Sequence, residues 1–268
     1  MDQTSSVSCY QFHRNSKLAQ TSSIAKINTN DGHVLAYSRV EGQSPKPTVL
    51  FLGGFMSDMN GTKAQALHQW AQTNNRSFIR FDYVGHGASS GKFTDGTIGL
   101  WLANVLTIFD QLTAGPVIVV GSSMGGWLML LLALQRSERV QALVGIASAP
   151  DFTELLMWDL MDEPIKQELT SKGIYTLKSE YGESPYPISW KLIEEGRNHV
   201  LLHKPIALQC PVRLIHGMKD NDVPYQLSLQ LSHDLESTDV RTILCKQGDH
   251  RMSSAEDIQL LIETIESL

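Results

Sequence analysis

A serine flanked by glycines is the first feature of the chain that suits nucleophilic catalysis. Residues 121–125 read Gly-Ser-Ser-Met-Gly, a GxSxG pattern with Ser123 at its centre, between the apolar runs Val117–Val120 and Trp127–Leu134. The arrangement predicts a tight turn from a buried strand into a helix, where the small glycines avoid collisions with neighbouring backbone. The first amides of such a helix have no internal acceptor, so negative charge developing near Ser123 would meet donors. We therefore interpret Ser123 as a nucleophile; the alternative is a helix start that happens to be rich in small residues.

A serine hydroxyl needs a base, and the base needs an acid that orients it. His250 is the candidate base, because it lies between an expected strand and the last expected helix. Asp220 is the candidate acid, because it lies in a loop after another expected strand and ahead of Pro224. Asp222 is an alternative acid and Asp249 lies beside the base; helix capping and turn formation are the other roles open to them.

Other serines and histidines are weaker candidates for these roles. Ser122 precedes the nucleophile, so we expect its side chain to point elsewhere and to serve the structure. We expect turn, cap or strand-end positions for His86, His199, His203 and His216, and exposed positions for His33, His68 and His233.

Acyl transfer also requires donors for the oxyanion that forms on the attacked carbonyl. The segment Leu52–Ser57, which reads Leu-Gly-Gly-Phe-Met-Ser, follows an expected early strand. Its two glycines would let the backbone approach Ser123 closely. We assign the oxyanion donors to the backbone amides of Phe55 and Met124; the alternative for the glycines is a simple tight turn.

The elements that must position these residues alternate along the chain. Short runs rich in valine, isoleucine, leucine and phenylalanine predict buried strands, and longer periodic stretches predict helices. The expected strands are Ile24–Asn28, Val34–Val40, Thr48–Leu52, Phe78–Phe81, Val117–Val120, Val140–Ala147, Val212–His216 and Val240–Leu244. The expected helices are Thr62–Gln72, Thr97–Leu112, Met124–Gln135, Tyr225–Asp234 and Ala255–Leu268. This alternation predicts an α/β fold with a mostly parallel, doubly wound sheet, preceded by an antiparallel hairpin at Asn30-Asp31-Gly32.

Two segments depart from the alternation. Residues 1–23 are rich in serine, threonine and glutamine and predict a flexible arm, whereas residues 24–268 form one domain. Within that domain, prolines and aromatic residues interrupt the pattern at about 150–205, which we interpret as a helical cap insertion. The cap supplies side chains that could line a substrate pocket or only pack the cap onto the body. These candidates are Met157, Trp158, Met161, Tyr186 and Trp190.

Composition excludes several classes of protein. The chain has 268 residues, and 22 Lys plus Arg against 28 Asp plus Glu give a net charge of −6, with no long basic run. We therefore expect neither nucleic acid nor an anionic membrane as a partner. The three cysteines are too few and too scattered for a disulfide framework or a CxxC metal site, so a reducing compartment fits. No stretch has the length of a membrane span, and the first residues lack the apolar core of a secretory signal.

On the basis of these residues, the chain resembles the α/β-hydrolase superfamily from about Ile24 to Leu268. Within it, the segments 60–64, 80–83, 121–130, 216–220 and 249–252 are similar to mitochondrial palmitoyl-protein thioesterases that also act as mycophenolic acid acyl-glucuronide esterases. The resemblance implies a catalytic triad of Ser123, Asp220 and His250, with Asp220 favoured over Asp222 by the HGxxDxxVP spacing. It further implies hydrolysis of carboxylic esters or thioesters without a cofactor or a metal.

Alternatives remain within and outside this activity. A carboxylate nucleophile, as in dehalogenases and epoxide hydrolases, is excluded by Ser123, whereas carbon–carbon bond hydrolases and peptidases keep the same three residue types. A non-catalytic ligand-binding homologue is the alternative from another class. We expect a small-molecule acyl substrate, a monomer and a cytoplasmic location, with a mitochondrial location as the alternative.

Overall fold

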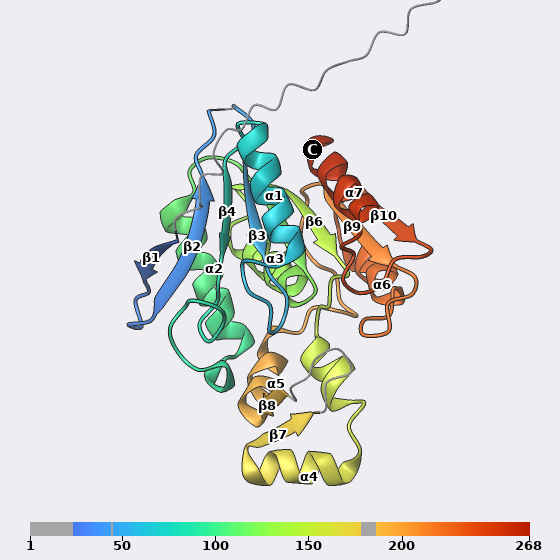
Figure 1. Ribbon diagram of the computed structural model, residues 1–268. Coiled ribbons are helices and arrows are strands. Elements are labelled where there is room, and N and C mark those ends of the chain that lie inside the picture. The colour runs from blue at the N-terminus through green and yellow to red at the C-terminus, as the bar shows by residue number, and fades with distance from the viewer. Residues whose placement is uncertain (1–23, 44, 178–185) are drawn as a thin grey trace, which may run out of the picture.

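An eight-stranded sheet carries the residues that the sequence singles out (Figure 1). The computed structural model describes residues 24–43, 45–177 and 186–268; the expected N-terminal arm lies outside these residues. In spatial order the strands are β1 (Ala25–Asn28), β2 (Val34–Val40), β4 (Phe78–Phe81), β3 (Thr48–Leu52), β5 (Val117–Ser122), β6 (Val140–Ile146), β9 (Val212–Gly217) and β10 (Val240–Cys245). Strand β2 pairs antiparallel with β1 and β4, and all other neighbours in this sheet are parallel. The predicted α/β fold and its N-terminal hairpin are confirmed.

Helices cover both faces of the sheet because successive strand side chains point to opposite faces. In β3 and β5, Leu50 and Val119 pack in the core shared with α2 (Ile98–Leu112) and α3 (Met124–Gln135). Their neighbours Phe51 and Val120 pack in a second core, which helices α1 (Thr62–Thr73) and α7 (Ala255–Glu266) close. Helix α6 (Gln226–Asp234) lies between β9 and β10 in the chain.

The chain between β6 and β9 forms a separate group of elements beyond one end of the sheet (Figure 1). It contains a π-helical turn, helix α4 (Glu163–Lys172), strands β7 (Ile174–Leu177) and β8 (Tyr186–Ser189), helix α5 (Trp190–Gly196) and a 3-10 turn. The sequence predicts helices alone here, whereas β7 and β8 pair as a two-stranded antiparallel sheet. Helix α4 ends at Gly173 with a φ of 78°, a left-handed conformation that suits glycine, and the residues after it extend.

A buried carboxylate joins the two ends of this group. Asp151, just after β6, has a φ of 57° and accepts hydrogen bonds from the amides of Leu201 (2.8 and 3.0 Å) and Leu202 (2.8 Å). A second contact links the group to the body, since the amide of Gly99 in α2 donates to Glu195 in α5 at 3.0 Å. None of the helices in the described ranges is long and apolar enough to span a membrane.

Candidate active site

Ser123 occupies a strained turn between β5 and α3. Its φ of 55° and ψ of −119° lie in a region that residues other than glycine rarely adopt. Close packing enforces the turn: a Cβ atom on Gly121 would lie 2.3 Å from the carbonyl oxygen of Gly125, and one on Gly125 would lie 2.2 Å from that of Leu52. The two glycines of the GxSxG pattern are therefore required by the backbone contacts, as the sequence predicts.

A chain of hydrogen bonds runs from Ser123 to a buried carboxylate. Nε2 of His250 lies 3.1 Å from Oγ of Ser123, and Nδ1 of His250 lies 2.7 Å from Oδ2 of Asp220. Because the carboxylate can only accept, Nδ1 carries the proton and Nε2 is free to accept from the serine hydroxyl. The structure thus brings together the three residues that the sequence singles out from three separate loops, 127 and 30 residues apart.

Four N–H groups surround the carboxylate of Asp220. Besides His250, Oδ2 faces Nε2 of His216 at 3.1 Å, and Oδ1 accepts from the amides of Asp222 (2.9 Å) and Val223 (2.8 Å). The burial of this side chain would raise its pKa, but the hydrogen bonds from His216, His250 and Val223 outweigh burial and hold the pKa of Asp220 well below its usual range. The group therefore stays ionised near neutral pH and can stabilise a positive charge on His250.

Asp222, the alternative acid that the sequence offers, lies close by but in a different position. Asp222 is exposed, and its amide donates to Asp220. Ligand atoms of Asp220, Asp222 and His250 lie within 4.8 Å of one another, which is the spacing of a possible cation site among the described residues. Both oxygens of Asp220 already accept from N–H donors, and the Nδ1 proton of His250 faces the same carboxylate. The donor set fits a hydrogen-bonding role better than metal binding.

Two backbone amides point to a place for negative charge near Ser123. Among the described residues, no hydrogen-bond acceptor is found for the amides of Phe55 and Met124. Gly54 lets its loop come close, since a Cβ atom there would lie 3.3 Å from Cβ of Ser123. Met124 is the first residue of α3, where the helix dipole also favours an anion.

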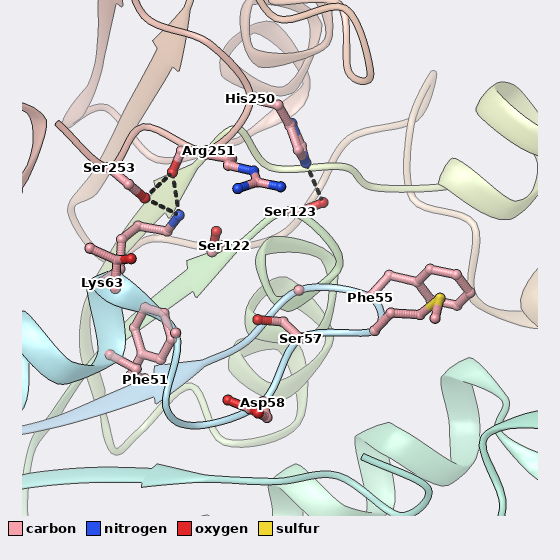
Figure 2. A pocket seen from close by; sticks show the side chains of 15 residues that line it. Phe51, Phe55, Ser57, Asp58, Lys63, Ser122, Ser123, His250, Arg251 and Ser253 are labelled. Atoms are coloured by element: carbon pink, nitrogen blue, oxygen red, sulfur yellow. Dashed lines mark hydrogen bonds between the residues drawn. The ribbon is translucent and has the colours of Figure 1, made fainter. Parts of the chain in front are cut away.

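A cavity of about 360 Å³ opens beside Ser123 (Figure 2). One wall comes from the loop after β3 and the start of α1, and the other from the residues around His250. Its lining residues are Phe51, Gly54, Phe55, Met56, Ser57, Asp58, Gly61, Thr62, Lys63, Ala64, Ser122, Ser123, His250, Arg251 and Ser253. Ser122, which we expected to point elsewhere, lies on this cavity. The sequence offered no local signal for Lys63 or Arg251, because the wall forms only when distant loops meet.

The five pocket residues that the sequence suggests are absent from that lining. Met157, Trp158, Met161, Tyr186 and Trp190 pack in the small apolar core of the segment between β6 and β9. Tyr186 alone of them makes a ring contact with the loop beside Ser123, its centroid 6.2 Å from that of Phe55. Packing, the alternative role, therefore accounts for the contacts of the other four.

One histidine differs from its expected position and another has a contact that the sequence did not reveal. His68 is buried at 5% exposure, against the exposed position that we expected, because its face of α1 packs on the sheet and its ring lies edge-on to Phe78. His216 lies at the end of β9, as expected, and is fully buried in contact with Asp220.

Comparisons with known proteins agree with this architecture. A family model described as the alpha/beta hydrolase fold matches residues 47–172, and one described as the prolyl oligopeptidase family matches residues 110–266. The human protein named palmitoyl-protein thioesterase ABHD10, mitochondrial, is 44% identical over 250 residues, which are 93% of this chain and 81% of that protein. The chain belongs to the alpha/beta hydrolase family.

Two solved structures are similar to nearly the whole chain. Alpha/beta hydrolase domain-containing protein 10 from mouse is 44% identical with a TM-score of 0.84, and the match covers 91% of this chain and 97% of that one. A putative hydrolase from Agrobacterium vitis S4 is 38% identical with a TM-score of 0.88, covering 92% and 98%.

Proposed function

We propose that this alpha/beta hydrolase cleaves carboxylic esters or thioesters through an acyl-enzyme on Ser123. The observation that carries the proposal is the continuous contact from Ser123 through His250 to an ionised Asp220, next to two amides without acceptors. That arrangement provides a nucleophile, a base with a fixed tautomer and donors for an oxyanion in one place.

The first half of the reaction acylates Ser123. Nε2 of His250 takes the hydroxyl proton while Oγ of Ser123 attacks the acyl carbonyl carbon. Negative charge collects on the carbonyl oxygen, where the amides of Phe55 and Met124 stabilise it; losing one such donor typically costs ~10²–10³ in turnover. The tetrahedral intermediate collapses as His250 gives its proton to the leaving alcohol or thiol, and Asp220 stabilises the transient imidazolium.

The second half returns the free enzyme. His250 takes a proton from water, whose oxygen attacks the acyl carbon of the Ser123 ester. Collapse of the second tetrahedral intermediate releases the carboxylic acid and returns the proton from His250 to Oγ of Ser123. These steps use only the side chains and amides of this chain.

Aromatic residues surround Phe55 on one side of Ser123. That ring has its centroid 4.9 Å from Phe93, 5.5 Å from Phe152 and 6.2 Å from Tyr186. Figure 2 shows Phe55 on the side of Ser123 away from Lys63. We propose that the acyl chain lies against this aromatic cluster and that the segment 150–205 acts as its cap within a single domain.

Peptide-bond hydrolysis is the second candidate. The observation in its favour is the match of the prolyl oligopeptidase model to residues 110–266, which contain Ser123, Asp220 and His250. The relatives that cover most of the chain carry thioesterase names, so we rank the ester and thioester activity first.

A substrate panel tests the proposal. The wild-type protein and Ser123→Ala are assayed with acyl thioesters, carboxylic esters and a prolyl peptide amide that share comparable chromophores. The proposal expects hydrolysis of esters or thioesters that Ser123→Ala abolishes, and little cleavage of the amide. Preferential cleavage of the amide would replace it with the peptidase assignment.

The same relatives bear on the acyl group and on the compartment. The human relative is named a palmitoyl-protein thioesterase, which supports an acyl group as the reacting part of the substrate. The printed name of the human relative includes mitochondrial, which supports the alternative compartment and gives no support to the cytoplasmic expectation.

A further inference from the structure

The cavity beside Ser123 carries more positive than negative side chains. Among its lining residues, Lys63 and Arg251 are cations, whereas Asp58 is the single carboxylate. Figure 2 shows Asp58 on the far side of Ser57 from Arg251, and Oδ1 of Asp58 accepts from the amide of Asn60 at 2.7 Å. The wall formed by Lys63 and Arg251, which we term the cationic wall, is thus separated from that carboxylate.

Lys63 is held in place by the loop that follows His250. Its Nζ donates to the carbonyl oxygen of Arg251 and lies 3.4 Å from Oγ of Ser253. Burial lowers the pKa of Lys63 to about 8, although the nearby carboxylates of Asp249 and Asp257 oppose that effect. An anion in the cavity would stabilise the protonated form of this amine.

Arg251 lies next to the residue that, in the proposed reaction, protonates the leaving group. It follows His250 directly, and both line the cavity. In the proposed reaction Nε2 of His250 delivers a proton to the leaving atom, so that atom lies within reach of His250. The remainder of the leaving group then extends along the wall that Arg251 and Lys63 provide, opposite the aromatic cluster around Phe55 (Figure 2).

The N-terminal end of α1 adds a partial positive charge beside the cationic wall. Gly61, Thr62 and Ala64 at the start of α1 line the cavity together with Lys63. No side chain caps this helix and its first turn holds no acidic residue, so its partial positive charge is not offset locally. The helix end adds to the two side chains but is not a site without them.

We propose that the cationic wall binds an anionic oxygen group, phosphate or carboxylate, on the leaving group of the substrate. The inference rests on the proposed ester or thioester hydrolysis and narrows it to leaving groups that bear a negative charge away from the reacting bond. The guanidinium of Arg251 suits a two-point contact with such a group, and the ammonium of Lys63 supplies a second positive charge within the cationic wall.

Matched thioesters test this preference. One pair consists of the octanoyl thioesters of pantetheine and 4′-phosphopantetheine, and the other of those of 3-mercaptopropanamide and 3-mercaptopropanoate. Each pair shares its acyl group and thioester bond and differs by one anionic group on the leaving thiol. Hydrogen bonds to charged groups are stronger than those between neutral groups, so we expect kcat/KM to be about tenfold or more higher for the charged member of at least one pair. The pair with the larger ratio identifies phosphate or carboxylate as the preferred group.

Three variants assign the preference to the cationic wall. In Arg251→Gln and Lys63→Gln the ratio within the responsive pair should fall towards one. Arg241→Gln is the matched control, because Arg241 lies on β10 with its side chain 73% exposed, and it should keep the wild-type ratio. Both substrates are measured on the same sample, so a general loss of activity or of folded protein cancels from the ratio. If Lys63 only anchors the loop after His250, its variant slows both substrates equally.

The outcomes separate this inference from the proposed function. Hydrolysis of both members of each pair at equal kcat/KM overturns the inference and leaves the proposed function intact. A preference for the charged member that persists in both Arg251→Gln and Lys63→Gln has the same consequence. Absence of any hydrolysis removes the function. Calorimetric binding of 4′-phosphopantetheine and of pantetheine to Ser123→Ala then decides the subsite alone: tighter binding of the phosphate compound that Arg251→Gln abolishes supports it, and equal binding overturns it.

Discussion

His216 donates to the same carboxylate oxygen of Asp220 that holds His250. Nε2 of His216 lies 3.1 Å from Oδ2 of Asp220 and 2.9 Å from the carbonyl oxygen of Val223, while its Nδ1 lies 2.7 Å from Oγ of Ser228. Both neighbours of Nε2 are acceptors, so Nε2 carries the proton and Nδ1 accepts from the serine hydroxyl. A fully buried histidine thus fixes the carboxylate that orients the candidate base.

Replacing His216 should impair turnover more than substrate binding. We expect His216→Phe to lower kcat about tenfold or more with little change in KM, because Asp220 loses a buried donor worth about 1–2 kcal/mol. His216→Gln, which retains an N–H donor, should recover part of that loss. Steady-state kinetics on a simple ester measures both constants, and His233→Gln is the control, since the side chain of His233 is 84% exposed. A rise in KM with unchanged kcat would argue against a positioning role.

The charge of Asp220 should contribute more to kcat than the charge of Asp222. Asp220→Asn keeps the size of the side chain but removes the charge that fixes the tautomer of His250, and a comparable change in a serine protease lowers kcat by about 10⁴. Asp222→Asn leaves the contact between Asp220 and His250 in place and should lower kcat less than about tenfold. Kinetics of the two variants at pH 7.5 compares them directly, and the reverse ranking would make Asp222 the acid.

Asp220 should also make stability depend on pH. Its pKa in the folded protein is depressed, so the folded state binds this proton less tightly than the unfolded chain, where the pKa is about 3.9. The stabilisation is complete above that unfolded value and is lost as pH falls from it towards the lower folded pKa. Urea unfolding between pH 6 and 3 should therefore show a smaller loss of stability for Asp220→Asn than for the wild type. If the free energies of unfolding of the wild type and of Asp220→Asn fall equally with pH, the depressed pKa of Asp220 is contradicted.

Backbone strain at Ser123 should lower the free energy of unfolding by a measurable amount. Glycine adopts a φ of 55° without the steric cost that a Cβ atom brings, so Ser123→Gly should be more stable than Ser123→Ala by about 1 kcal/mol. Both variants lack the nucleophile, which makes them a matched pair. Thermal and urea unfolding provide the comparison, and a stability order with alanine above glycine would mean that the turn is unstrained.

Local sequence patterns were sufficient for the sheet and for the turn at Ser123. Buried strands such as β5 are continuous apolar runs, and every predicted strand and helix of the α/β body agrees with the structure to within two residues at its ends. The GxSxG turn is equally local, because its glycine requirement arises from contacts between neighbouring loops and the turn itself. Elements of this kind can be predicted because the residues that determine them lie close together in the sequence.

Contacts between distant segments were beyond such patterns. Lys63 and the carbonyl group of Arg251 are 188 residues apart, and nothing near either residue indicates that they meet. The aromatic residues of the segment 150–205 illustrate the opposite problem, because the same side chains suit a ligand pocket and an apolar core. Their packing in a core of their own depends on β7 and β8, which the sequence did not predict.

The central claim, that Ser123 is a nucleophile activated by His250, is tested most directly by intact mass after treatment with a fluorophosphonate. Wild-type protein should gain one adduct, and so should Ser122→Ala, the matched control on the same cavity. Ser123→Ala should gain none. His250→Ala should react at least about 10² times more slowly than the wild type, as expected when a general base is lost. A folded wild-type protein that gains no adduct, or a Ser123→Ala variant that still gains one, would contradict the account.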